Sequence, residues 1–196
     1  MKCCCKIPLR EEKIQGVSTM ICPKCGLITK DSKISFQEER KRYDAHICDA
    51  GYIQYMKGLF EKLKEYIKGP TALDYGCGKI HILADLLNQN GIQADYYDLH
   101  YYPMLLDKTY DTIFLIEVFE HLYEPYDELL KLQNMLKSKG RIIIVTKTYD
   151  DVDLEHWWYF RDITHISFIR RSTLSYWNLN MKIIEQKGDI LVLERI

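Results

Sequence analysis

Apolar residues recur at helical spacing in the first third of the chain. Between residues 52 and 67 they fall on one face of a predicted helix, as Tyr52, Met56, Leu59, Phe60, Leu63 and Ile67. The Gly69-Pro70 pair ends this segment, because proline cannot continue a helix. A shorter helix is predicted before it, from Ser35 to about Ile47, because Ser35 and Glu38 have the spacing of a capping box.

From residue 71 onward, the pattern alternates between strands and helices. Short apolar runs predict strands at residues 71–75, 92–97, 111–116 and 141–147. Helices are predicted at residues 80–91, from Pro125 through Leu136, and as a short helix capped by Ser172. Two final strands, at 181–186 and 189–194, predict an antiparallel hairpin. Repeated strand–helix units predict an α/β fold with a doubly wound, mainly parallel sheet.

The composition excludes several classes of protein. With 196 residues, the chain suffices for one ordinary domain and a small appendage. The net charge of −1 excludes a strongly basic nucleic-acid wrapper, and 47% apolar residues exclude wholesale disorder. No stretch approaches the roughly 18 apolar residues of a membrane span, and the N-terminus lacks the hydrophobic segment of a signal peptide. We therefore expect a cytoplasmic location and no membrane partner.

Five of the seven cysteines lie between Cys3 and Cys25, in a segment expected to form turns and small strands. In the cytoplasm such cysteines are thiols or metal ligands rather than disulfides. Cys22-Pro-Lys-Cys25 followed by glycine is a zinc-knuckle pattern, since it lets two thiolates reach one tetrahedral ion. The second pair of ligands has to come from residues 3–5, which lack that spacing. A structural zinc held by Cys3, Cys5, Cys22 and Cys25 is the hypothesis, and a metal-free remnant is the alternative.

A glycine turn, Gly76-Cys77-Gly78, follows the strand at 71–75, where parallel sheets bind ligands. Glycines there let the backbone approach a ligand closely; a tight turn with nothing bound is the alternative. Asp98 closes the next strand. A carboxylate at this distance along the chain from the glycine turn can accept both ribose hydroxyls of a nucleoside cofactor. His81 stands where a dinucleotide site usually needs a small residue, which argues against NAD.

The segment Leu73–Gly78 resembles the first motif of class I S-adenosylmethionine-dependent methyltransferases, an acidic residue in an apolar strand followed by G-x-G. Residues 110–122 look like the fourth strand of that family and the E-V-x-E-H-L signature after it. Residues 136–140 are similar to its turn before strand five, and the terminal hairpin fits its antiparallel last strand. The resemblance covers residues 52–196 and implies a Rossmann-like fold with S-adenosylmethionine as cofactor.

The resemblance also implies roles for individual residues. Gly76 and Gly78 would border the methionine part of the cofactor, Asp74 would orient its amino group, and Asp98 would hold the ribose. Residues at the end of the fourth strand would lie beside the sulfonium and the acceptor; these are Glu117, Phe119, Glu120 and His121.

Further cofactor contacts are assigned by position. Cys77 lies between the two glycines, where a small side chain fits a crowded turn, and Leu99 follows Asp98. Tyr43 and His46 belong to the preceding helix, which closes over the cofactor in the branch of the family that this sequence resembles. Simple helix packing is the alternative for this pair.

The connection after Asp98 is shorter than the family usually has. Only the segment 99–110 precedes the strand at 111–116. This is too short for the usual helix and third strand, so we expect a reduced third-strand region. The residues that cover adenine are therefore placed by position only, with Leu99, His100 and Tyr101 as candidates.

Residues 155–168 combine aromatic and polar side chains in one loop, and resemble a W-x-Y…D-x-T-H-x-x-F segment of small bacterial methyltransferases. We expect Asp162 and His165 in the acceptor pocket. His165 and His121 are the candidate general bases, because a histidine has a suitable pKa for removing a proton from the acceptor. The alternative is a lid packed by Trp157 and Trp158, with Arg161 and Asp162 as a surface ion pair.

The resulting hypothesis is an enzyme that transfers a methyl group to a small-molecule acceptor by in-line displacement. An inactive or regulatory methyltransferase-like domain with an RNA- or protein-binding ribbon is the alternative. Three parts are expected: a zinc-ribbon-like segment (1–34), a helix and linker (35–51), and the methyltransferase domain (52–196). Nucleic acid is not excluded as a partner, because Lys24, Lys30 and Lys33 could form a local basic patch that binds it. The oligomeric state also stays open.

Overall fold

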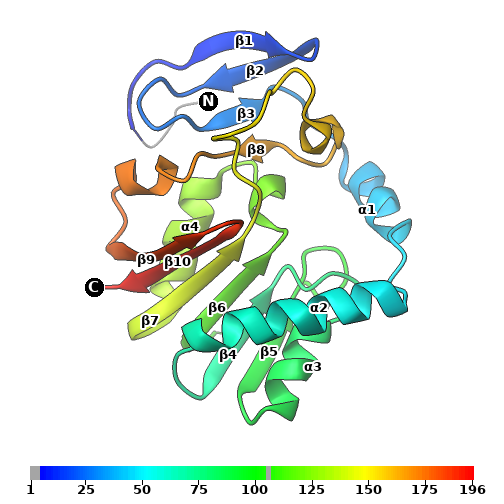
Figure 1. The fold of residues 1–196 in the computed structure, drawn as a ribbon, viewed down its shortest axis with the longest axis vertical. Coiled ribbons are helices and arrows are strands. Elements are labelled where there is room, and N and C mark those ends of the chain that lie inside the picture. Colours follow the sequence, from blue (N-terminus) through cyan, green and yellow to red (C-terminus); the bar gives the residue numbers. More distant parts are fainter. Residues whose placement is uncertain (1–4, 105–106) are drawn as a thin grey trace.

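The computed structural model describes residues 5–104 and 107–196 (Figure 1). Its main feature is a six-stranded sheet in the order β5-β4-β6-β7-β10-β9. The strands are β4 (Thr71–Tyr75), β5 (Gln93–Tyr97), β6 (Tyr110–Ile116), β7 (Leu136–Val145), β9 (Met181–Lys187) and β10 (Ile190–Arg195). β5, β4, β6 and β7 are parallel, whereas β10 runs antiparallel to both β7 and β9. The expected mainly parallel sheet with an antiparallel C-terminal hairpin is confirmed.

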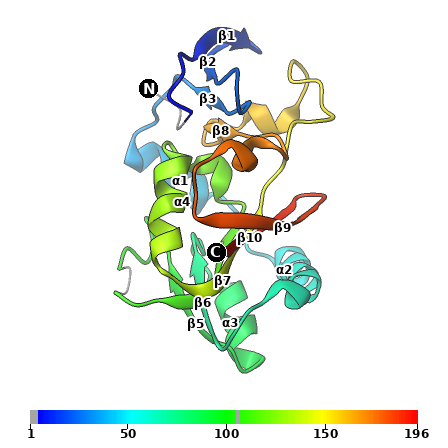
Figure 2. The same ribbon diagram turned by 90° about the vertical axis from the view of Figure 1, so that its left-hand side faces the viewer.

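Helices cover both faces of this sheet (Figures 1 and 2). α2 (Ala50–Leu63), which continues into a 3-10 turn at Lys64–Tyr66, and α3 (Ile82–Gln89) pack on one face; α4 (Pro125–Asn134) packs on the other. Alternate strand residues face opposite sides. In β6, Phe114 packs with α2 and α3, whereas Ile113 and Leu115 pack with α4. The alternating strand and helix patterns thus produce a doubly wound fold.

The region between β5 and β6 is reduced, as expected. Among the residues described there, the only β pairing is an isolated bridge between Asp98 and Tyr102. The third strand of the family has no counterpart in the described part of this connection, so β5 forms the edge of the sheet.

A second, four-stranded antiparallel sheet has the order β1-β2-β3-β8. Its strands are β1 (Arg10–Ile14), β2 (Val17–Ile21), β3 (Ile28–Lys30) and β8 (Ser167–Phe168). The last strand comes from the aromatic loop, where Phe168 pairs with Ile28 although most of the chain separates them. The N-terminal segment and the aromatic loop therefore form one structural unit. The division of the chain at residues 34 and 51 stays a prediction.

The aromatic loop packs against this small sheet through one of its two tryptophans. Trp157 is buried with Phe168 and Phe160, whereas Trp158, at the start of a 3-10 turn (Trp158–Arg161), is 63% exposed. The alternative interpretation, a lid packed by both tryptophans, is therefore wrong in the case of Trp158.

α1 (Phe36–Asp44) begins with the expected capping box. Ser35 accepts the N–H of Glu38, and the Glu38 carboxylate accepts the N–H of Ser35. Every residue of the helix keeps some solvent exposure. α1 therefore lies on the surface of the fold, and side-chain contacts hold it to the rest of the molecule.

Two expected boundaries are wrong. α4 ends at Asn134, and Leu136 opens β7 instead, because it pairs with Tyr110 and both side chains are fully buried. Ser172 has helical backbone angles and makes no capping hydrogen bond to the 3-10 turn Thr173–Tyr176, whereas a capping residue needs extended backbone. No described helix combines the length and apolarity that crossing a bilayer would demand.

Candidate functional site

Two glycines in left-handed backbone shape the turn after β4. Gly76 has φ +80°, and a Cβ there would lie 2.4 Å from Cγ2 of Val118. Gly78 has φ +70°, but its Cβ would meet no described atom within 4 Å. The N–H groups of Gly76 and Cys77 both donate to the carbonyl of Tyr97, at 2.7 and 3.0 Å. The turn is therefore fixed to the end of β5, and it borders open space at Gly78.

Asp98 lies beside this turn. Its Oδ2 accepts the N–H of Gly78 at 3.0 Å, and its Oδ1 accepts the N–H groups of His100 and Tyr101 at 2.8 and 3.1 Å. A carboxylate has about four acceptor positions, so these bonds leave about one, at Oδ2. One ribose hydroxyl could use that position, whereas binding both hydroxyls would require a backbone bond to break.

Asp74 lies inside β4 and is only 4% exposed. Its Oδ2 accepts the N–H of Ala84, in the first turn of α3, at 3.3 Å. Burial, which outweighs this hydrogen bond, raises the pKa of Asp74 to about 7. A cationic ligand group next to the carboxyl would favour its ionised form.

Cys77 and Leu99 are placed less favourably for chemistry. Burial raises the pKa of the Cys77 thiol, which keeps it protonated and disfavours a nucleophilic role. Leu99 is 55% exposed, so in this conformation most of its side chain faces solvent. Both assignments to the cofactor stay predictions.

The segment after β6 holds two acidic side chains close together. Glu117 has φ +52°, which is uncommon for a residue other than glycine. The Tyr159 hydroxyl donates to Glu120 at 2.5 Å and also lies 3.3 Å from a Glu117 oxygen. Glu120, only 1% exposed, accepts a further bond from the Thr146 hydroxyl at 2.9 Å. Burial raises the pKa of both acids, and the nearby Glu120 charge contributes to a pKa of about 7 for Glu117.

His121 and His165 meet at this acidic group. Their rings are 4.9 Å apart between centroids. Each Nδ1 is bonded to a backbone carbonyl, that of Thr164 for His121 at 2.9 Å and that of Tyr159 for His165 at 2.8 Å. Burial lowers both pKa values, to about 4 for His165, so both rings are neutral at pH 7. The structure thus brings together the two histidines that the sequence analysis singled out.

Asp162 lies near the histidines but its carboxylate is already engaged. Oδ1 accepts the N–H and hydroxyl of Thr164 at 2.9 and 2.7 Å, and Oδ2 pairs with Arg42 of α1 at 2.9 Å. Although burial opposes it, these bonds hold the pKa of Asp162 well below its usual range. The alternative interpretation, a surface ion pair of Asp162 with Arg161, is wrong, because the ion-pair partner of Asp162 is Arg42. In this structure Asp162 fixes the loop to α1.

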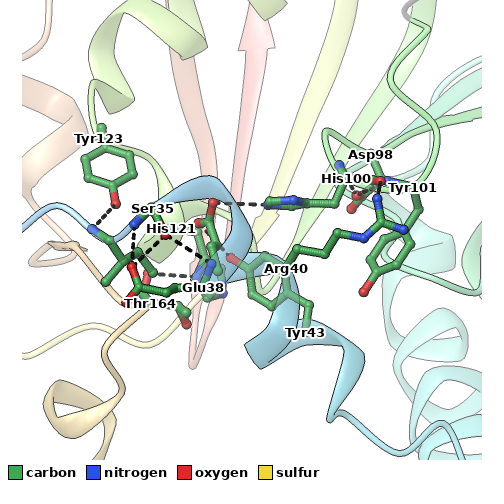
Figure 3. Close-up of polar contacts among 12 residues, drawn as sticks. Ser35, Glu38, Arg40, Tyr43, Asp98, His100, Tyr101, His121, Tyr123 and Thr164 are labelled. Atoms are coloured by element: carbon green, nitrogen blue, oxygen red, sulfur yellow. Dashed lines mark hydrogen bonds and ion pairs between the residues drawn. The ribbon is translucent and has the colours of Figure 1, made fainter.

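α1 bridges this histidine cluster and the loop after β5 (Figure 3). At the loop, Glu39 bonds Nε2 of His100 at 3.0 Å, and Arg40 donates to the His100 carbonyl at 2.8 Å. Between the two sides, the ring of Tyr43 meets the rings of His100 and His121 edge-on, at 5.2 and 5.4 Å. α1 therefore lies across the gap between the ends of β5 and β6.

His46 follows α1 on the same side of the site. Its ring lies 6.2 Å from that of Tyr43, and burial together with the Arg42 charge lowers its pKa. Tyr43 and His46 thus lie near the candidate acceptor residues, while their contact with a cofactor stays a prediction.

Three of the four predicted zinc ligands come together. One sulfur atom from each of Cys5, Cys22 and Cys25 lies within 4.8 Å of the others, and Cys22 and Cys25 are buried. The N–H of Cys25 points to the Cys22 sulfur at 3.5 Å. Cys3 lies outside the described residues.

Lys30 is not part of an exposed basic patch, which corrects the sequence analysis. It is 5% exposed, its Nζ donates to the Asp162 carbonyl at 2.7 Å, and it lies over the ring of Phe160. Burial lowers its pKa to about 8. Lys30 therefore fastens the aromatic loop to the small sheet instead of presenting charge to nucleic acid.

The sequence profile of a family described as "Methyltransferase domain" matches residues 43–180, which is well over half of the chain. The chain belongs to the class I S-adenosylmethionine-dependent methyltransferase family. No curated protein matches it significantly.

Several solved structures are similar to this methyltransferase domain at low identity. Coclaurine N-methyltransferase, bound to N-methylheliamine and SAH, is 17% identical with a TM-score of 0.49 over 66% of this chain and 50% of its own. A putative methyltransferase from Bacillus halodurans C-125 is 16% identical, with a TM-score of 0.48 over 64% and 70%. Magnesium protoporphyrin IX methyltransferase from Synechocystis PCC 6803, with bound SAM, is 16% identical, with a TM-score of 0.45 over 85% and 86%. The chain spans half the length of the first of these proteins, and such likeness does not identify an acceptor.

Some residues of the site escaped the sequence analysis of this methyltransferase domain. Glu120 was assigned only a general place beside the acceptor, and Tyr159 and Thr146 were not singled out, although both bind Glu120. His100 was named only for the adenine side, and its hydrogen bond with Glu39 was not expected. These contacts join segments far apart in the chain, and no local spacing in the sequence signals them.

Proposed function

We propose that this domain transfers a methyl group from S-adenosylmethionine to a small-molecule acceptor. The observation that carries the proposal is the Gly78 turn, which borders open space with the Asp98 carboxylate 3.0 Å away. The cofactor supplies an electrophilic methyl group on a sulfonium. A lone pair of the acceptor forms the new bond to the methyl carbon as the carbon–sulfur bond breaks, which requires alignment and exclusion of water.

The residues of the chain would divide this task between the two strand ends. Gly76, Gly78 and Asp98 would hold the methionine and ribose parts of the cofactor. The buried Asp74 carboxyl would receive the cofactor's amino group, whose charge favours the ionised acid. The acceptor would lie between Tyr43 and the two site histidines.

His121, His165 and Asp162 would have different roles on the acceptor side. The two histidines are neutral and buried next to Glu120, so they face the acceptor as hydrogen-bonding groups. Asp162 would position them, because it fixes the backbone of Thr164, whose carbonyl holds His121.

The proposal is tested by calorimetric titration of the full chain with S-adenosylmethionine, its demethylated product and NAD. We expect binding of both methyl-cycle compounds and none of NAD. Asp98→Ala should weaken this binding at least tenfold, because the ribose loses a charge-assisted hydrogen bond. Asp95→Ala is the matched control, since Asp95 lies in β5, the strand directly before Asp98, but pairs with Lys108. The absence of heat with either methyl-cycle compound would contradict the proposal and favour the inactive, regulatory module.

We also propose a structural zinc ion at Cys5, Cys22 and Cys25, with Cys3 as the fourth ligand. The convergence of three sulfur atoms and the N–H donated to Cys22 support it, since such bonds stabilise metal-bound thiolates. Elemental analysis of protein purified without added zinc should give about one zinc per chain. A ratio near zero would contradict this site.

A further inference from the structure

We propose that Glu120, His121 and His165 bind a divalent transition-metal ion that holds an oxygen atom of the methyl acceptor. The proposal rests on the methyltransferase function above and deepens it, because it names the acceptor class as a compound with an ionisable hydroxyl group. The three residues come from the turn after β6 (Phe119–His121) and from the aromatic loop. They form a cluster separate from the cysteines.

The ligand atoms of these three residues converge on one point. One ligand atom from each of the three residues lies within 4.8 Å of the other two. Two atoms bound to one ion, each at about 2.1 Å, can be at most about 4.2 Å apart. Small side-chain movements would therefore bring the three atoms into coordination range. Glu120 is 1% exposed and His165 9% exposed, whereas His121 is partly exposed, so the cluster lies inside the protein with His121 on its solvent side.

The two imidazole rings are also oriented as in metal-binding histidines. Histidines that bind metals nearly always donate the other ring N–H to a carbonyl or carboxylate, which fixes the tautomer. Both histidines have such a partner, since each Nδ1 is bonded to a backbone carbonyl, of Thr164 or of Tyr159. When the Nδ1 proton is donated to the carbonyl, the Nε2 atom of the ring carries the lone pair that a metal needs.

The cluster also contains buried acidic groups without a paired cation. Glu117 and Glu120 share the hydroxyl of Tyr159, so two buried carboxyl groups lie close together. Among the described residues, neither forms an ion pair with a lysine, arginine or histidine; Lys147, whose charge acts on Glu117, pairs with Asp189 instead. Buried carboxylates are normally paired with a cation or bound to a metal. A divalent ion would supply the missing positive charge.

The ligand set indicates the kind of ion and its chemistry. Two imidazoles and one carboxylate suit first-row divalent ions such as Zn²⁺, Mn²⁺ and Fe²⁺. Three protein ligands leave positions for an acceptor oxygen. There the ion lowers the pKa of the acceptor hydroxyl, which releases its proton to solvent. The resulting oxygen forms the bond to the methyl carbon, and the carbon–sulfur bond breaks to leave a neutral thioether.

The test measures Mn²⁺ binding to the full chain by electron paramagnetic resonance, without added zinc, because zinc would compete for the same imidazoles and carboxylate. Mn²⁺ prefers oxygen and imidazole ligands over thiolates, so this probe separates the two clusters. We expect saturable binding of one Mn²⁺ per chain. His165→Ala and Glu120→Gln should each weaken it at least tenfold. His156→Ala is the matched control and should bind as the parent does, since His156 lies in the same loop but its ring contacts Asp153.

The outcomes separate this inference from the function on which it rests. Equal Mn²⁺ binding by the parent and both site variants, or none by the parent, would overturn the metal site. S-adenosylmethionine titrated in parallel reports on the cofactor site alone. Cofactor binding without Mn²⁺ binding refutes only the metal, and Mn²⁺ binding without cofactor binding refutes only the methyltransferase proposal. If circular dichroism shows that His165→Ala does not fold, Mn²⁺ binding by Glu120→Gln tests the metal site alone, because this substitution keeps the side-chain volume.

Discussion

At the scale of single residues, the two glycines of the turn after β4 have different structural roles. Gly76 is required both for its left-handed backbone and because Val118 fills the space that a Cβ would take, whereas Gly78 is required only for the backbone conformation. The G-x-G pattern predicts both glycines. It could not separate them, because Val118 follows a different strand and no local spacing links it to Gly76.

Replacing each glycine with alanine should reveal this difference. We expect Gly76→Ala to lower the free energy of unfolding by about 2–4 kcal/mol, since strain at positive φ and overpacking add. Gly78→Ala should cost about 1 kcal/mol, from the backbone conformation alone. Urea denaturation followed by circular dichroism measures both values. Equal losses for the two variants would contradict the assignment.

Asp74 should make stability depend on pH in a defined window. Its folded pKa of about 7 lies above the ordinary value of 3.8, so between these values the folded state binds more protons than the unfolded state. The free energy of unfolding should therefore fall as the pH rises from about 4 to about 7, by up to about 4 kcal/mol from this group.

Asp74→Asn should remove this contribution. Asparagine keeps an oxygen for the Ala84 N–H but cannot ionise. Denaturation of the parent and Asp74→Asn at a series of pH values measures the difference, in which contributions from Glu117 and Glu120 largely cancel. A parent-to-variant difference that stays constant from pH 4 to 7 would show that Asp74 does not titrate as described.

At the scale of elements, α1 shows where prediction from sequence ends. Its start was predicted from the capping box, but it ends at Asp44 and not at about Ile47 as expected. The position of α1 in the fold was not predicted, because the helix lacks the amphipathic pattern that would indicate a buried face. Arg40 and Arg42 hold it instead, through the His100 carbonyl and the Asp162 carboxylate.

Arg42→Ala should loosen α1 without unfolding the domain. The variant removes the ion pair with Asp162, and we expect faster hydrogen exchange in residues 36–44 and weaker binding of S-adenosylmethionine. Lys41→Ala is the control, since Lys41 is exposed on the same helix. If exchange in α1 is unchanged by Arg42→Ala, the ion pair does not hold the helix.

At the scale of the whole molecule, the central sheet could be predicted and the small sheet could not. Strand and helix periods, with four family motifs in order, indicated the doubly wound fold. The small sheet depends on pairing between Ile28 and Phe168 and on the Thr173 hydroxyl, which donates to the Cys25 carbonyl at 2.8 Å. Such long-range contacts follow from the folded shape and leave no periodic signal in the sequence.

The same contacts predict a response to metal removal. If zinc holds the cysteine cluster, chelation should raise hydrogen exchange at residues 159–168, because β8 pairs with β3 and the N–H of Lys30 donates to the Ile166 carbonyl. Residues 71–75, inside the central sheet, should stay protected. Exchange that rises equally in both segments would indicate global unfolding instead of a local link.

The pairing of β3 with β8 also has a consequence for synthesis on the ribosome. β3 is synthesised well before its partner strand β8, because most of the described chain lies between them. Until β8 is made, the β3 edge of the small sheet therefore lacks its partner, and unpaired strand edges favour wrong association. A product truncated between β3 and β8 would therefore expose an unpaired strand edge that can associate wrongly.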